Sequence, residues 1–172
     1  PRAYLLGGIA GHAGLFSTAE DLAVYGQMLI QGGQYGGVQI LQAATVAQMT
    51  TPHRVGEGLR GLGWDMRTGY SSNRGDLYSP RAFGHGGFTG TAIWIDPQLE
   101  LIVIFLSNRL HPDGKGTVNP LIGRIGTVAV AAIEEASASL PTTETAAEGT
   151  VLTGIDVLVR DGFRQLQGRR VG

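Results

Sequence analysis

The stretch of this sequence best suited to chemistry is a glycine cluster that carries one histidine, Gly84-His85-Gly86-Gly87, and leads directly into Phe88. Glycine in a strand lets the backbone approach a ligand or another segment closely. Histidine can give up or accept a proton near neutral pH. An apolar run follows at once, as is typical of a strand. We therefore expect an edge strand here that forms one wall of an active site.

Two helices are predicted before this stretch. Ser17-Thr18-Ala19-Glu20 has the form of a capping box, in which Ser17 and Glu20 satisfy each other's backbone amides. Apolar residues then follow at helical spacing, and Gly32-Gly33 ends the helix. A short second helix is expected over 43–49.

The strands that should surround the glycine cluster are more apolar. A strand is expected over 62–66, and two more over 91–95 and 101–107, joined by a turn at Asp96-Pro97. Residues 101–106 are apolar on both alternating faces, which is typical of a strand covered on both sides. We expect this strand to lie centrally in a sheet between helices.

A helix is predicted from Asn119, an N-cap followed by Pro120 at the first helical position. One face should pack on the sheet, and further apolar residues lie beside it at Ile122, Ala129 and Ile133. The expected packing face consists of Leu121, Ile125, Val128 and Ala132. The elements together predict an α/β chain of the α+β type, with an antiparallel sheet flanked by helices.

Composition excludes several classes of function. With 42% hydrophobic and 16% charged residues, the 172-residue chain should fold around a core. Thirteen basic and fourteen acidic residues form no basic stripe, so nucleic acid is not an expected partner. No apolar run approaches the ~18 residues of a membrane span. The chain has no cysteine and four scattered histidines, so neither a metal site nor another cofactor is expected.

Two segments, Gly11–Leu22 and Phe83–Gly90, resemble the serine β-lactamase-like family. The most similar branch is the class C type, which includes penicillin-binding proteins and esterases. The order of the strands and the helix over 91–135 is also similar to the end of that fold. The resemblance covers residues 1 to about 135, and it implies an incomplete β-lactamase/transpeptidase-like domain.

The family uses three catalytic motifs: Ser-x-x-Lys, Tyr-x-Asn or Ser-x-Asn, and Lys-Thr-Gly on an edge strand. The third is found here as His85-Gly86-Gly87. No serine has a lysine three positions later, and no tyrosine has an asparagine two positions later. Because those motifs come earlier in the family, the resemblance implies the C-terminal part of a serine hydrolase domain without its nucleophile.

The resemblance also implies roles for the catalytic candidates His85, Gly86, Gly87 and Phe88. His85 would replace the family's lysine and assist proton transfer. Gly86 lacks the hydroxyl that helps to hold a substrate carboxylate. The amide of Phe88 would be one of two oxyanion donors. The alternatives are a histidine satisfied by local backbone and a Gly87 that only permits strand twist.

Two further residues, Thr89 and His12, are candidates for substrate binding. Thr89 follows the motif directly, and His12 lies in a glycine-rich loop that can approach the rim of the site. The alternatives are strand geometry for Thr89 and packing or capping for His12.

The composition changes near the C-terminus. Residues 136–150 are rich in Ala, Ser, Thr and Glu and are typical of a linker. Val151–Leu158 and Leu166–Gly172 are similar to the opening of exo-β-N-acetylmuramidases of the NamZ type. The sequence therefore predicts the start of a second domain over 151–172.

The function implied is that of a C-terminal part of a serine hydrolase that cleaves amide or ester bonds through an acyl-enzyme. Its substrate would be a small molecule or derive from peptidoglycan, and its partner would be the missing N-terminal part of the same domain. A bacterial periplasmic or extracellular location is expected, although no signal peptide is visible. The alternatives are a non-catalytic peptidoglycan-binding relative, which Gly86 favours, and an interaction domain of other ancestry.

Overall fold

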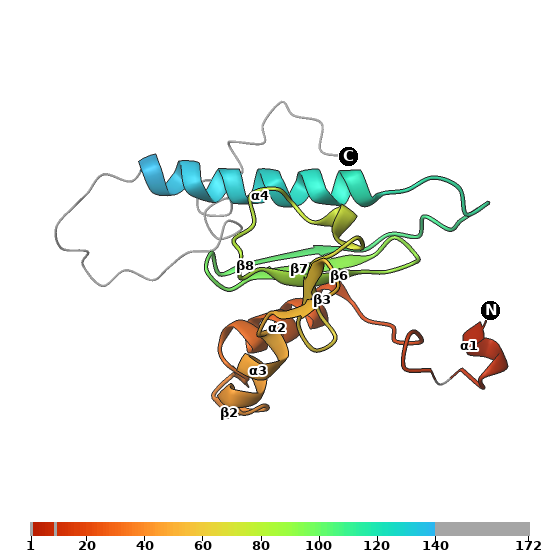
Figure 1. Cartoon of the computed structure of the whole chain (residues 1–172), viewed down its shortest axis with the longest axis horizontal. Helices are drawn as coiled ribbons and strands as arrows, with labels where there is room; N and C mark the ends of the chain where they lie inside the picture. Colours follow the sequence, from red (N-terminus) through yellow and green to blue (C-terminus); the bar gives the residue numbers. More distant parts are fainter. Residues whose placement is uncertain (1, 9, 140–172) are drawn as a thin grey trace, which may run out of the picture. The chain divides into compact units, whose positions relative to one another are not determined.

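The computed structural model describes residues 2–8 and 10–139. The chain divides into two units after Ala138, and the description below concerns the first. Its elements, shown in Figure 1, are α1 (Arg2–Leu5), α2 (Ala19–Ile30), β1 (Gln34–Tyr35), β2 (Val38–Gln39), α3 (Ala43–Thr50), β3 (His53–Val55), β4 (Gly58–Arg60), β5 (Asp65–Arg67), the 3-10 helix η1 (Ser71–Asn73), β6 (Phe83–Gly86), β7 (Ala92–Asp96), β8 (Leu101–Phe105) and α4 (Asn119–Ser139).

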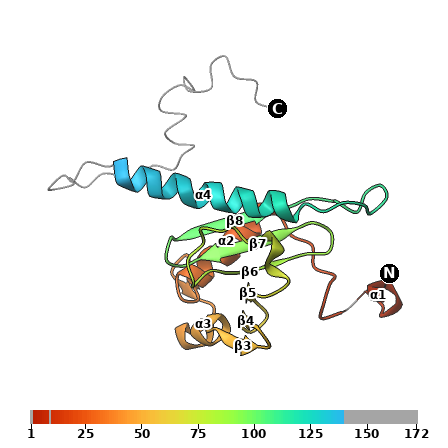
Figure 2. The same cartoon turned by 45° about the horizontal axis from the view of Figure 1, so that its top comes forward.

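The main sheet has six strands in the order β3-β4-β5-β6-β7-β8, and every neighbouring pair is antiparallel. Helix α2 packs on one face of the sheet and α4 on the other, as Figure 2 shows. The predicted architecture, an antiparallel sheet flanked by helices, is therefore confirmed. A separate two-stranded hairpin, β1-β2, follows α2.

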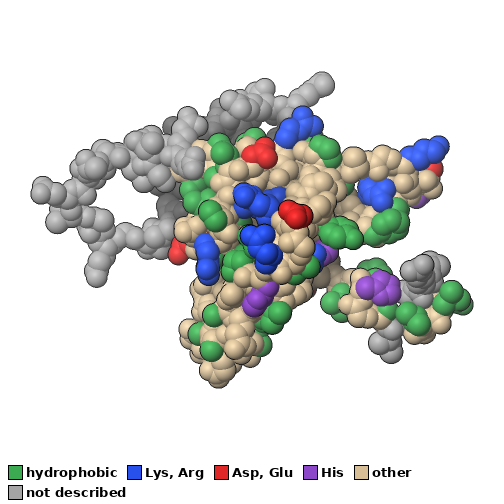
Figure 3. All heavy atoms as spheres, viewed as in Figure 1, with side chains coloured by type: hydrophobic (Ala, Val, Ile, Leu, Met, Phe, Trp, Pro, Cys, Tyr) green, Lys and Arg blue, Asp and Glu red, His purple; other side chains and the backbone are tan. Residues whose placement is uncertain are grey.

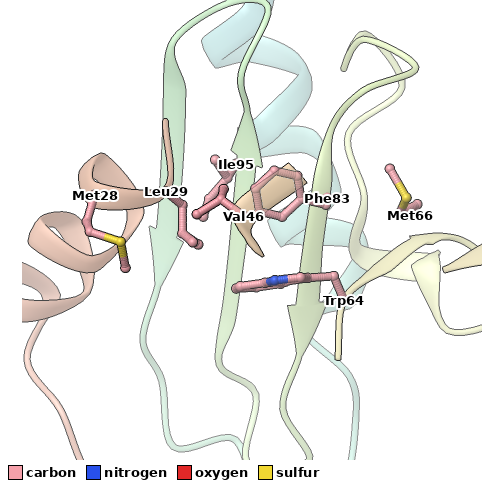
Figure 4. Close-up of a cluster of buried hydrophobic side chains, with 7 residues drawn as sticks. All are labelled: Met28, Leu29, Val46, Trp64, Met66, Phe83 and Ile95. Atoms are coloured by element: carbon pink, nitrogen blue, oxygen red, sulfur yellow. The ribbon is translucent and has the colours of Figure 1, made fainter. Parts of the chain in front are cut away.

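The core on the α2 face gathers side chains from α2, α3 and the sheet (Figure 4). Trp64 meets Phe83 edge to face, with ring centroids 5.1 Å apart. Phe83 and Ile95 are cross-strand partners in β6 and β7. Each fully buried side chain of this size contributes ~1.5–3 kcal/mol to the stability of the fold. This cluster holds the first half of β6 in place.

The core on the α4 face is built around Trp94, which contacts Tyr78 from the preceding loop and lies in one cluster with Ile122 and Val130 of α4. The Arg74 guanidinium lies 5.9 Å from the Trp94 ring centroid. Burial raises the pKa of Tyr78 above its ordinary value, and the carboxylate of Asp96 raises it further. Both tryptophans of the chain are thus core residues.

The two predicted helix starts are each shifted by one residue. The N-cap of α2 is Thr18, whose Oγ1 accepts the amide of Asp21 at 3.1 Å, and not Ser17. At α4, Asn119 is already inside the helix, and its side chain donates to the Ser72 Oγ at 2.8 Å. At the start of α4, the Asn119 amide donates to the Thr117 Oγ1 at 3.2 Å, and the Ile122 amide donates to the Val118 carbonyl at 3.0 Å.

The predicted packing face of α4 is wrong. Leu121, Ile125 and Val128 are exposed, while Ile122 and Val130 are almost completely buried. The reason is close approach: a Cβ at Gly126 would lie 2.8 Å from the Tyr78 hydroxyl, and one at Gly123 only 3.2 Å from the Arg74 carbonyl oxygen. The helix therefore turns its glycine side toward the loop before β6.

The predicted central position of the strand over 101–106 is also wrong among the described residues. β8 ends the strand order of the sheet, and its residues are half-buried. The apolar pattern is explained by its two covered faces: Ile102 lies against Gly26 of α2, while Val103 packs into the cluster on the α4 side. Apolar residues on both faces of a strand therefore indicate that helices cover both faces. They do not indicate how many strands lie beside it.

Other predictions met different outcomes. The helix over 43–49 and the strands over 62–66 and 91–95 are present as α3, β5 and β7, while β3 and β4 arise from a region without a strand pattern. The helix α4 extends to Ser139, beyond the predicted linker start at 136. The similarity of 151–172 to another family lies outside the described residues and stays a prediction.

None of the helices among residues 2–8 and 10–139 combines the length and the apolar composition needed to cross a membrane.

Candidate active site

The strand that carries the candidate residues lies inside the sheet rather than at its edge. β6 pairs fully with β7 from Phe83 to Gly86, but it meets β5 only through the pair Asp65 and Gly84. The prediction of an edge strand is therefore wrong for the strand as a whole. On the β5 side, however, the pairing stops before His85, so the second half of the strand has an edge without a β5 partner.

The imidazole of His85 is exposed. Side chains alternate along a strand, so His85 lies on the same face of the sheet as Phe83. Its cross-strand partner on β7 is Ile93. Its Nδ1 lies 2.7 Å from the carbonyl oxygen of Gly86. Because a carbonyl only accepts, Nδ1 carries the proton, and in the neutral ring Nε2 is left with a free lone pair. The ring can therefore accept or return a proton through Nε2.

The glycines of β6 are each explained by a neighbour in the protein. A Cβ at Gly84 would overlap the Ile93 carbonyl and the Trp94 ring, and a Cβ at Gly86 would overlap the side-chain amide of Asn73. Asn73 is buried, and its Oδ1 accepts the indole N–H of Trp94 at 3.2 Å. The space that a side chain at position 86 would need is thus filled by an amide from η1.

The turn after β6 presents backbone donors. The amide of Gly87 donates to the Thr91 carbonyl at 2.6 Å, and the amide of Gly90 donates to the Gly87 carbonyl at 3.0 Å. The amides between them, those of Phe88 and Thr89, donate to no acceptor among the described residues. The Phe88 side chain is 78% exposed. The turn therefore offers two adjacent N–H groups that are free to bind a negative oxygen.

The two substrate-binding candidates differ in position. Thr89 is part of the turn, and its carbonyl accepts the backbone amide of Arg109 at 3.0 Å. His12 is exposed in the loop before α2, beside an isolated bridge between Ala10 and Ala13. Among the described residues His12 forms no hydrogen bond with β6 or its turn.

One sequence match was missed at the outset: Ser71-Ser72-Asn73 fits the Ser-x-Asn pattern. The Ser71 hydroxyl donates to the buried Asp65 carboxylate at 2.8 Å, and Asn73 binds Trp94. These side chains are occupied in holding η1 against the sheet. The match to the Ser-x-Asn pattern is therefore one of spacing only. Ser71 binds the buried carboxylate of Asp65, so its hydroxyl has a structural role.

Charged groups do not assemble into a second site. Lys115 pairs with Asp113 at 3.2 Å on the surface, and hydrogen bonds from Lys115 lower the pKa of Asp113. Within the described part of the chain, no three His, Asp or Glu side chains are placed to hold a metal ion. On the face seen in Figure 3 the histidine side chains lie apart from one another.

Two hollows of the described surface lie away from His85. One is lined by Val55, Glu57, Arg67 and neighbouring residues, and the other by Arg124, Ile125, Val128 and Ala129 of α4. His85 and Phe88 are exposed, and neither of them lines these two hollows.

A comparison with protein families identifies the family of this chain. The model of the family described as "Beta-lactamase" matches residues 1–126. The chain belongs to the beta-lactamase family. β6, β7, β8 and the first part of α4 lie within the matched residues.

Two proteins with related sequences share one name. A protein of Salmonella enteritidis PT4 named "Putative D-alanyl-D-alanine carboxypeptidase" is 42% identical over 120 residues, which is 68% of this chain and 28% of that protein. A protein of the same name from Escherichia coli K12 is 39% identical over 131 residues, or 74% and 30%. The chain therefore spans less than a third of the length of these relatives.

A solved structure supports the same fold. The crystal structure of a beta-lactamase from Mycobacterium bovis matches with a TM-score of 0.52 and 25% identity, over 68% of this chain and 44% of that chain. The family and the fold agree, and more than half of that beta-lactamase has no counterpart in the residues compared.

Proposed function

We propose that this chain supplies one oxyanion-hole donor and one side of the active site of a serine hydrolase, which cleaves amide or ester bonds through an acyl-enzyme. The observation that carries the proposal is the Phe88 amide. It lies in the turn that directly follows β6, the strand of His85, and it donates to no acceptor among the described residues. Such a donor stabilises charge that develops on the acyl oxygen. Loss of one donor of this kind costs ~3 kcal/mol of transition-state stabilisation.

His85 supplies the proton transfer in this proposal. With Nδ1 bound to the Gly86 carbonyl, Nε2 is free to exchange a proton with the nucleophile or with the leaving group. The nucleophile itself must come from residues outside this sequence, since no serine here is followed by lysine three positions later. Thr89 contributes to substrate binding at the same turn. His12 is proposed as a rim residue.

The substrate we propose is a small or peptidoglycan-derived amide or ester. Relatives named for D-alanyl-D-alanine carboxypeptidase activity support the link to the cell wall. A periplasmic or extracellular location goes with that substrate. Since residue 86 has no hydroxyl and Asn73 fills its place, recognition of a substrate carboxylate would use other groups.

The rest of the domain is the proposed partner. Among the described residues β8 is the last strand of the sheet and has neither proline nor charge, and edges of this kind can pair with another strand. Next to it, Leu121, Ile125 and Val128 leave an apolar stripe of α4 exposed. We propose that the missing N-terminal part of the domain covers both and supplies the opposite side of the site.

A second candidate function is a non-catalytic relative that binds peptidoglycan. The packing of Asn73 against Gly86 favours it, because that packing removes a position the family uses for its substrate. Binding without catalysis would need the same exposed surface at His85 and the turn after β6, but no acylated serine.

A chimera tests the proposal. The 131-residue segment of the Escherichia coli relative that aligns with this chain is replaced by the matching residues of this chain. We expect the chimera to be labelled covalently by a fluorophosphonate or a fluorescent penicillin, and labelling to fall when His85 is replaced by alanine. The unchanged relative gives the reference. A folded chimera that binds peptidoglycan but is never labelled would support the second candidate instead.

A further inference from the structure

One arginine that follows β8 connects the oxyanion turn with the next loop. We propose that Arg109 is a positioning residue. It helps to fix the direction of the Phe88 backbone N–H by holding the Phe88 carbonyl group. The inference rests on the proposed function, because it concerns the same turn.

The contacts of Arg109 with the turn are numerous. Its Nε donates to the Phe88 carbonyl at 3.1 Å, and its backbone amide donates to the Thr89 carbonyl at 3.0 Å. The guanidinium carbon lies 5.2 Å from the centroid of the Phe88 ring, within the range of a cation–π contact. The same side chain therefore holds both the backbone and the ring of Phe88.

The other end of the guanidinium reaches the following loop. Nη1 donates to the carbonyl of Gly114 at 3.0 Å and to that of Gly116 at 3.1 Å. No carboxylate of the described residues lies within ion-pair distance of Arg109. Its charge is thus directed at three carbonyl oxygens. A planar guanidinium can reach three acceptors in fixed directions, whereas a lysine ammonium is a single compact donor centre.

These contacts determine where the Phe88 N–H points. On one side, the Gly87 amide donates to Thr91, and the Gly87 carbonyl, which lies in the same peptide plane as the Phe88 N–H, accepts the Gly90 amide at 3.0 Å. On the other side, the Phe88 carbonyl is fixed by Arg109. The peptide plane between the two anchors carries the free N–H, so its direction follows from both.

Gly90 makes this arrangement possible. It has a φ of 92°, and a Cβ there would lie 2.7 Å from the Arg109 Cγ and 2.6 Å from the Ser107 Oγ. Ser107 in turn donates to the Gly90 carbonyl at 2.7 Å. The arginine stem can pass the turn only because the side chain is missing at this position.

The first test uses the 172-residue chain and backbone amide NMR. In Arg109→Ala and Arg109→Lys we expect the amide signals of 87–90 and 114–116 to shift or broaden, with the signals of the sheet unchanged. Arg124→Ala, which removes an exposed arginine of α4, is the matched control and should leave all of these signals in place. Unchanged signals of the turn in Arg109→Ala would overturn the inference.

The second test places the same variants in the chimera described above and measures ester hydrolysis. We expect kcat to fall about tenfold in Arg109→Ala and Arg109→Lys, with KM changed less than twofold, because oxyanion stabilisation acts in the transition state. An unchanged kcat, or a loss confined to KM, would contradict the positioning role. A chimera without any labelling would refute the proposed function, and the NMR test would still decide whether Arg109 holds the turn.

Discussion

Replacing Gly86 by threonine would restore the side chain that the family motif has at this position, and we expect it to destabilise the chain. The new Cβ would overlap the Asn73 amide, which is buried and cannot withdraw into solvent. Asn73 would have to move away from Trp94, and the indole N–H would lose the acceptor that now lies at 3.2 Å.

The magnitude follows from two costs. Overpacking a well-packed core costs ~1–3 kcal/mol, and a buried donor left without an acceptor costs ~1–3 kcal/mol. The free energy of unfolding of Gly86→Thr should therefore fall by ~4 kcal/mol, the sum of the middle values of these two ranges. Urea denaturation followed by tryptophan fluorescence measures it, because Trp64 and Trp94 lie in the two cores.

A double-mutant cycle separates the two costs. Asn73→Ala alone should cost ~1–3 kcal/mol, because it also orphans the indole N–H of Trp94. In Gly86→Thr/Asn73→Ala the threonine has room, so the double variant should be more stable than the sum of the single effects predicts, by at least ~1 kcal/mol. A Gly86→Thr variant as stable as the wild type would refute this account of the strand.

Three further predictions concern other parts of the chain. The purified 172-residue chain should show no covalent labelling by a fluorophosphonate or a fluorescent penicillin in gel fluorescence, and stoichiometric labelling would disprove the assignment of the nucleophile to residues outside this sequence. Thr18→Ala should lower the free energy of unfolding by ~1 kcal/mol, because it removes the cap of α2, whereas Ser17→Ala should change it by less than 0.5 kcal/mol, roughly. Stability should fall as pH rises above ~10, because unfolded tyrosine ionises there while the pKa of buried Tyr78 is raised, so that folding is favoured by the protonated phenol. Urea titrations at pH 8 and pH 11 test this, and Tyr78→Phe should remove part of the difference.

Much of the local structure could be predicted from the sequence. The helix that ends at Gly32-Gly33, the hairpin of β7 and β8 and the helix that begins at Asn119 all depend on caps, turns and apolar periodicity within a few residues. The segments Gly11–Leu22 and Phe83–Gly90, taken together with the order of the elements, indicated the family that the comparison then showed. These features are local because hydrogen bonds and dihedral preferences act between near neighbours in the chain.

The rest was decided by contacts between distant segments. No local pattern indicates that Asn73 fills the space beside Gly86, or that Arg109 holds the turn after β6. The buried face of α4 also depended on Tyr78, a residue more than forty positions away from Gly126 in the sequence. Sequence patterns were enough to predict α2, α3, β5, β7, β8 and α4 and to indicate the family. Contacts between distant segments set which faces are buried and where the Phe88 amide points, because close packing fits each side chain to neighbours that the fold brings together.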